Sequence, residues 1–305
     1  MKLKVLLHPA LPVQVKGHLF FNFLVHQMDK VFHHSAFAYT LIAVMLIFFQ
    51  SLYLNNIVVR HRLFHRNTYL PAFVYLLITS AFPKWNYFCD TIIINWLLLI
   101  SMDVMFEFSK TPHPRKLIYN AALLLCVVGL FQLTGLGFFV FLIVGLILFR
   151  SFNPGEWSVA LLGYATPAYF LASILFLFDR LHSFKNWLHV GFSIEKVTTN
   201  QGYFAATMGG LAFLFLSGVL VMRQNVTLSN IYIRRNWMAI TFYLIIAILV
   251  AFATDKEVSG AWTLVLPPAG IMMSHAYALE RHKKFSVFVF YFSLIFIGFC
   301  LWANK

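Results

Sequence analysis

Long apolar runs separated by short polar turns make up most of this chain. The runs are continuous rather than alternating, which favours helices over the strands of a membrane β-barrel. The runs whose length approaches that of a membrane-crossing helix lie at about 36–54, 69–83, 91–108, 118–134, 136–149, 158–178, 204–222, 237–254, 261–279 and 286–303. Because such a helix needs roughly 17–25 mostly apolar residues, we predict an all-α, polytopic transmembrane helix bundle with about nine or ten spans. The lower count applies if Gly135 and Gly137 mark a re-entrant piece.

Two segments differ from these runs because apolar and polar residues are mixed within them. Residues 15–35 carry a short apolar stretch, Leu19–Val25, flanked by polar residues and histidines. The segment 179–203 is similar. Both are typical of interfacial helices that lie along a membrane surface, and together they predict a roofed cavity on one face. We therefore divide the chain into an N-terminal tail with an amphipathic helix, 1–35, and a transmembrane helical domain, 36–305.

The composition supports a membrane location. Hydrophobic residues form 61% of the 305 residues and charged residues only 11%. A soluble domain is usually about 45–50% apolar and about 25% charged, so lipid is the solvent that this composition requires. The net charge of +13 belongs to the turns. Nucleic-acid binding would need a basic face on a soluble module, which the pattern lacks, so no nucleic-acid partner is expected.

Lysine and arginine are unevenly distributed over the turns. If residues 36–54 run from outside to inside, the inside turns hold Arg60, Arg62, Arg66, Lys110, Arg115, Lys116, Arg150, Arg223, Arg234, Arg235, Arg281, Lys283 and Lys284. The outside turns hold fewer basic residues. They also contain most of the acidic residues that lie in turns: Asp90, Asp179, Glu195, Asp255 and Glu257. The positive-inside rule supports this orientation, which places the C-terminus outside.

Histidine and cysteine do not predict a metal centre. Cys89, Cys126 and Cys300 are far apart and form no CxxC or CxxH motif. His61 and His65 share a helical face, but the other clustered histidines fall on the opposite side of the membrane. We predict neither a metal nor a cofactor. The basic turn at 60–66 is interpreted as a cytoplasmic turn that contacts anionic headgroups.

Ionisable residues and prolines inside the apolar runs suggest transport. Asp103 lies within 91–108, and Glu107 follows one helical turn later. Such groups face the bundle interior, although the alternative is a helix that ends near Met102 and leaves both acids among the headgroups. Pro167 and Pro267 lie in the middle of their runs and predict kinked or broken helices, which transporters use to bind substrate. A transporter or flippase is therefore one alternative.

Several short motifs resemble a known family. They are NTYLPAFVYLLITSAFP (67–83), FRSFNPGEW (149–157), LLGYATPAYF (161–170) and SNIYIRRNW (229–237). They are similar to an uncharacterised bacterial family of polytopic inner-membrane proteins, filed as a domain of unknown function. The resemblance implies a multi-pass protein of the bacterial inner membrane. In the second motif, Arg150 and Glu156 are placed to pair, and Trp157 suits the aromatic belt.

The bundle as a whole is also similar to GT-C glycosyltransferases and O-antigen polymerase-like proteins. This architectural resemblance implies a role in handling envelope glycans or lipid-linked sugars. In such an enzyme, a polyprenyl-phosphate-linked glycosyltransferase or polymerase, Asp29 would be the catalytic carboxylate. Arg180, His182, Lys185 and His189 would bind the lipid phosphate, and Arg180 suits it by its fork geometry.

We expect this glycan-handling role, with membrane lipids and a lipid-linked sugar as partners. A degenerate member of the class is compatible with the same pattern, because the transmembrane helix that usually precedes the catalytic loop is missing. A second alternative is a non-catalytic subunit that anchors an envelope complex through other membrane proteins.

Overall fold

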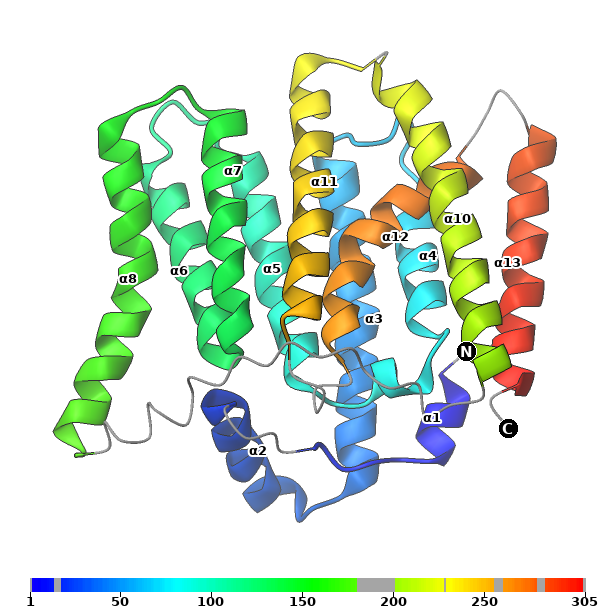
Figure 1. Ribbon diagram of the computed structural model, residues 1–305, viewed down its shortest axis with the longest axis horizontal. Coiled ribbons are helices and arrows are strands. Elements are labelled where there is room, and N and C mark those ends of the chain that lie inside the picture. The colour runs from blue at the N-terminus through cyan, green and yellow to red at the C-terminus, as the bar shows by residue number, and fades with distance from the viewer. Residues whose placement is uncertain are drawn as a thin grey trace.

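The computed structural model describes residues 2–13, 18–179, 201–227, 229–254, 260–278 and 283–303. All regular secondary structure in these ranges is helical, which confirms the predicted all-α class (Figure 1). The elements are α1 (Leu3–Leu7), α2 (Leu19–Phe32), α3 (Ala36–Arg60), α4 (Leu70–Thr79), η1 (Pro83–Asn86), α5 (Asp90–Phe106), α6 (Arg115–Phe131), η2 (Leu133–Phe138), α7 (Phe139–Phe149), α8 (Pro154–Leu177), α10 (Gln201–Thr227), α11 (Ile231–Phe252), η3 (Ala261–Val265), α12 (Leu266–Ser274), η4 (His275–Tyr277) and α13 (Lys283–Ala303).

The long helices stand roughly parallel and alternate in direction along the chain. In Figure 1, α3, α5, α7 and α10 run upwards, whereas α4, α6, α8, α11 and α13 run downwards. Each predicted apolar run therefore contains a helix. Within the described residues, four helical stretches are long and apolar enough to cross a membrane: Ala36–Arg60, Pro154–Leu177, Gly202–Gln224 and Ile231–Phe252. Their length and composition indicate a membrane protein.

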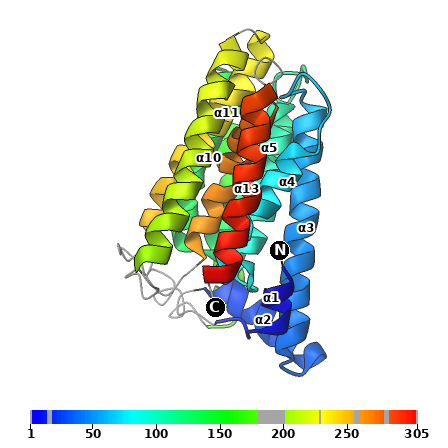
Figure 2. The ribbon, with the colours of Figure 1, turned by 90° about the vertical axis from the view of Figure 1, so that its right-hand side faces the viewer.

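Basic side chains gather at the upper end of the bundle. The upper turns of Figure 1 contain Arg60, Arg62, Arg66, Lys110, Arg115, Lys116, Arg150, Arg234 and Arg235. The lower end carries α1, α2 and η1 (Figure 2). The upper turns of the described bundle are therefore strongly basic.

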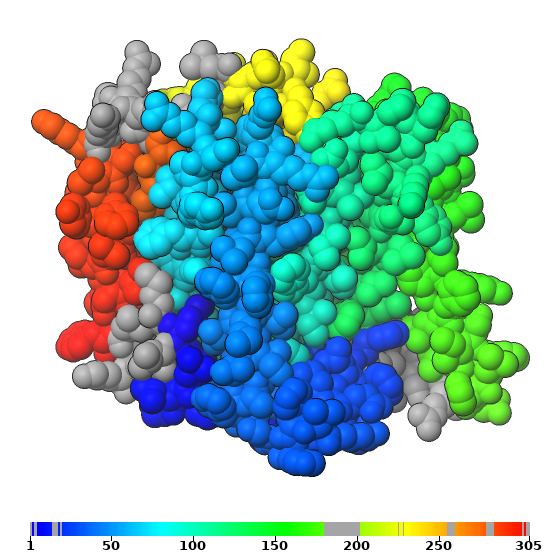
Figure 3. Space-filling model, turned by 180° about the vertical axis from the view of Figure 1, so that it is seen from behind, coloured from blue at the N-terminus to red at the C-terminus, as the bar shows by residue number. Residues whose placement is uncertain are grey.

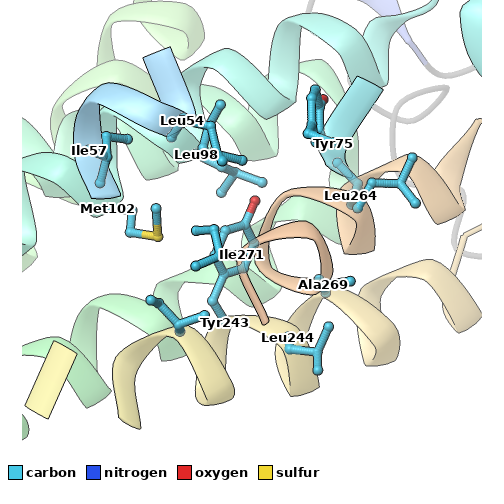
Figure 4. Close-up of a cluster of buried hydrophobic side chains, with 14 of the residues drawn as sticks. Leu54, Ile57, Tyr75, Leu98, Met102, Tyr243, Leu244, Leu264, Ala269 and Ile271 are labelled. Carbon is cyan, nitrogen blue, oxygen red and sulfur yellow. The ribbon is translucent and has the colours of Figure 1, made fainter. Parts of the chain in front are cut away.

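The centre of the bundle is built from α3, α4, α5, α11 and α12. Short α4 and α12 pack closely on each other, and every residue of α12 is buried. Figure 4 shows side chains from these elements meeting in one apolar cluster, which includes Tyr75 of α4 and Tyr243 of α11. From behind, α3 runs along the face of the molecule from the lower to the upper end (Figure 3).

Helix α2 of the N-terminal tail packs on the bundle by one face. Phe21 and Val25 are buried in the core, whereas Phe23 and Val31 on the other face are exposed. Gln27 is the polar residue among the apolar side chains that line a pocket of about 430 Å³ between this helix and the end of α6. The helix is thus anchored to the bundle by one face.

The two proline positions have different outcomes. Helix α8 continues through Pro167, so of the predicted kink or break the break does not occur. The half of α8 around Pro167 is largely exposed. Pro267 lies in the first turn of α12, directly after the 3-10 segment η3. The missing amide donor costs no hydrogen bond at that position, so Pro267 starts a helix rather than interrupting one.

Candidate functional site

A buried histidine–aspartate pair lies near the upper end of the bundle. His61 is the first residue after α3, and Asp103 lies in the last turn of α5. The Nε2 atom of His61 is 2.7 Å from a carboxylate oxygen of Asp103. The His61 side chain is completely buried, and its ring packs edge-on against Phe106 at 5.0 Å between centroids. A contact between two ionisable groups in such a place is much stronger than the same contact at the surface.

Three further charged side chains extend the pair towards the surface. Arg60 donates to the second oxygen of Asp103 at 3.0 Å and lies 3.3 Å from Glu107. Lys110 lies 3.0 Å from Glu107 and 3.2 Å from Nδ1 of His61. The two carboxylates are thus matched by the two cations, so a protonated His61 would add an unbalanced positive charge.

Two tyrosines tie this cluster to its helices. Tyr53 of α3 donates its hydroxyl to Asp103 at 3.1 Å. Tyr232 of α11 has its hydroxyl 2.9 Å from Nδ1 of His61 and donates to the Phe106 carbonyl at 3.1 Å. The cluster therefore joins α3, α5 and α11, and a change in its charge acts on the contacts between all three helices.

Sequence analysis found part of this cluster. Asp103 and Glu107, predicted from their position in an apolar run, do lie together. They lie near the basic end of the bundle, where both contact Arg60. Helix α5 ends at Phe106, beyond the end near Met102 that the alternative assumed. The roles of Arg60 and His61 were missed, since both were assigned to a solvated turn. The seven-residue spacing of Tyr53 and Arg60 on α3 is the signal that places both on one face.

Asp29 has partners of its own at the opposite end. It lies near the end of α2, where its carboxylate accepts from the Tyr39 hydroxyl at 2.6 Å and lies 3.0 Å from Nδ1 of His34. Its side chain is 12% exposed. Arg180, His182, Lys185 and His189 lie outside the described residues, so a shared site with Asp29 stays a prediction.

A second histidine–aspartate pair lies at that same lower end. Nδ1 of His18 is 2.5 Å from the Asp90 carboxylate, which also accepts from the Thr91 amide at the start of α5. Both side chains are at least nine-tenths buried. Helix α5 thus carries a buried aspartate with a histidine partner near each of its ends, an arrangement that sequence analysis did not predict.

The Arg150–Glu156 pair was predicted and is confirmed. Nε and an Nη of Arg150 contact the two Glu156 oxygens at 3.1 Å and 2.7 Å. The hydrogen bonds to Glu156 raise the pKa of Arg150. This two-pronged contact joins the end of α7 to the start of α8, so its role is to hold a turn.

His61 cannot complete the metal chelate with His65 that their spacing would permit. Both of its ring nitrogens face other side chains, Asp103 on one side and Tyr232 with Lys110 on the other. Among the residues that the structure describes, no group of three or more His, Cys, Asp or Glu side chains is arranged to hold a metal ion.

Comparison with known proteins gives this chain no relatives. No family model matches the sequence, and no match is found among curated proteins or among solved structures.

Proposed function

We propose that this protein is a multi-pass membrane transporter in which proton binding at the His61–Asp103 cluster is coupled to movement of a small solute through the helical bundle. The observation that carries the proposal is the complete burial of His61 against Asp103. Ionisable groups within a membrane bundle are costly and commonly serve proton or ion pathways. Histidine is the side chain that ordinarily changes charge near neutral pH.

The position of the cluster supports coupling to a conformational change. Its contacts join α3, α5 and α11, and Arg60 and Lys110 balance Asp103 and Glu107. A change in the protonation of His61 would change its contacts with Asp103, Tyr232 and Lys110, and so the contacts between the three helices. Only a group that binds protons differently in two states can shift their balance, and a three-helix junction is suited to that role.

The short central helices provide a further argument. Transporters place substrate between discontinuous helices near the middle of the membrane. Helix α4 and helix α12 are both short, lie side by side in the centre, and α12 is preceded by the 3-10 segment η3. We infer that solute moves next to this pair of helices.

We further propose a topology of ten membrane crossings, with α3, α4, α5, α6, α7, α8, α10, α11, the segment 261–277 and α13 each crossing once. The basic upper end would face the cytoplasm of a bacterial cell, with α2 on the outer face and the C-terminus outside. Membrane lipids are the expected partners of the exposed helix faces. A reporter fused after Arg62 should be located in the cytoplasm, whereas one fused after Lys84 should be located outside.

Proteoliposomes loaded with a pH-sensitive dye test the function. Sugars, amino acids and organic anions are added in turn under an inward proton gradient, and the internal pH is followed. We expect at least one solute class to cause internal acidification that is lost in Asp103→Asn and retained in Glu156→Gln, a control at the same end of the bundle. Equal responses of both variants would refute the role of the cluster.

A second measurement does not depend on finding the solute. Spin labels on α3 and α11 report the distance between these helices as the pH is lowered from 8 to 5, the range in which histidine titrates. The distance distribution should change in the wild-type protein and stay constant in Asp103→Asn. A distribution that is constant in the wild type as well would contradict coupling through this junction.

A further inference from the structure

One face of α11 carries a line of polar side chains into the core. Tyr232, Asn236 and Tyr243 follow one another at four- and seven-residue spacings, so they share a face of the helix. Tyr232 at the upper end reaches His61. Asn236 and Tyr243 are completely buried. Neither the Asn236 amide nor the Tyr243 hydroxyl has a hydrogen-bond partner among the described residues.

His275 lies beside this line and is also without a partner. It is 3% exposed, and neither ring nitrogen has a hydrogen-bond partner within the described part of the chain. Its ring lies between two aromatic rings, stacked on Phe64 at 4.2 Å and tilted towards Trp237 at 4.8 Å. Since Trp237 adjoins Asn236 on α11, the His275 ring and the Asn236 amide lie at the same level of the bundle.

The line continues towards the lower end through hydrogen-bonded groups. Tyr243 and Tyr75 lie in the same buried cluster, as Figure 4 shows. The Tyr75 hydroxyl donates to Gln50 at 2.9 Å, and the Gln50 amide donates to the Ile92 carbonyl at 2.6 Å. Ile92 lies in the first turn of α5, two residues after Asp90, whose carboxylate pairs with His18.

Unpartnered polar groups at this depth need a partner that the described residues do not supply. Leaving a buried donor or acceptor unsatisfied costs about 1–3 kcal/mol. Buried waters relieve this cost, typically by making about three hydrogen bonds each to such groups. The Asn236 amide, the His275 ring and the Tyr243 hydroxyl offer both donors and acceptors, which is the pattern that water fits.

We propose that internal water molecules bind at Asn236, His275 and Tyr243 and form a polar path between the His61–Asp103 cluster and the Tyr75–Gln50 pair, directed towards Asp90 and His18. The path gives protons a route from one histidine–aspartate pair to the other. Its use in solute movement rests on the proposed function, whereas its hydration does not. Apolar side chains such as Leu98, Met102 and Ile271 enclose its middle section (Figure 4).

Hydroxyl-radical labelling by short X-ray pulses tests hydration in the intact protein reconstituted into lipid nanodiscs, because radicals form from water next to the modified side chain. Tyr243 is compared with Tyr39, an equally buried tyrosine whose hydroxyl is bound to Asp29. We expect Tyr243 to be oxidised several-fold faster than Tyr39. Equal rates would overturn the proposal.

The variant Asn236→Leu tests the same path by removing water ligands while keeping the branched side-chain shape. The oxidation rate of Tyr243 should fall to that of Tyr39, and the thermal stability should be unchanged or higher because no unsatisfied amide remains buried. An unchanged Tyr243 rate in a folded variant would refute the path. If the variant does not fold, the wild-type comparison decides.

The outcomes separate this proposal from the proposed function. Slow oxidation of Tyr243 together with a pH-dependent distance between α3 and α11 would remove the path and leave the role of His61 and Asp103 intact. Fast oxidation with a pH-independent distance would support the path and refute coupling at the cluster.

Discussion

Asp103→Asn measures how the two main partners of this carboxylate share its stabilising effect. His61 is completely buried, whereas the Arg60 side chain is 51% exposed. A buried hydrogen bond to a charged group contributes about 1.5–3 kcal/mol, and an exposed ion pair about 0.2–1 kcal/mol. The Tyr53 bond survives because the amide oxygen of asparagine still accepts it. We expect Asp103→Asn to lower the free energy of unfolding by about 2–4 kcal/mol.

A double-mutant cycle separates the partners. Asp103→Asn is combined with His61→Phe, which keeps the ring against Phe106, and separately with Arg60→Met, which keeps the aliphatic stem. Unfolding is followed by circular dichroism in mixed micelles as the fraction of denaturing detergent rises. The coupling energy with His61 should be about 1.5–3 kcal/mol and that with Arg60 below about 1 kcal/mol. An equal or larger coupling with Arg60 would refute the argument that burial sets the strength of these contacts.

Three further predictions concern other contacts. Gly218→Val should lower the free energy of unfolding by about 1–3 kcal/mol, because a Cβ at this position would lie 2.5 Å from the α12 backbone. The control Gly209→Val should leave thermal unfolding unchanged, because a Cβ at position 209 would have no atom within 4 Å. Burial lowers the pKa of Lys2 from 10.5 to about 7. Between pH 7 and 10.5, Lys2 is therefore protonated more often when α1 is undocked than when α1 is docked on the bundle. Docking of α1 should therefore strengthen as pH rises from 7 to 10.5, seen as reduced spin-label mobility that Lys2→Met makes independent of pH. Arg150→Lys keeps the charge but loses one hydrogen bond to Glu156, so it should lower the free energy of unfolding by about 1 kcal/mol in a thermal unfolding measurement. An unchanged free energy would contradict a two-pronged contact.

The helices were predictable because each is an apolar run with a physical stop. Helix α8 begins at Pro154, before the predicted run 158–178, with Asn153 accepting from the Gly155 amide at its start. The shortness of α4 was not predictable, since the run 69–83 continues in composition beyond Thr79, where the structure turns into η1. Tertiary packing, not hydropathy, decides where that helix ends.

The candidate site was predictable only where the signal is local. Asp103 stands out as an acid in an apolar run, and Glu107 follows at helical spacing. Tyr232 is 171 residues from His61 in sequence and carries no local mark of the contact. His18 and Asp90 were missed for the same reason, because each is an unremarkable polar residue until the fold brings them together.

The complete burial of α12 has a consequence for biogenesis. A nine-residue helix is about 14 Å long, well short of the apolar thickness of a bilayer of about 30 Å. It begins with two prolines and contains a glycine and a serine, so it is a weak signal for the insertion machinery when it emerges from the ribosome. Its neighbours α4 and α10 are synthesised earlier and supply the surfaces against which it packs. We therefore expect this part of the chain to enter the membrane through protein–protein contact rather than by partitioning into lipid.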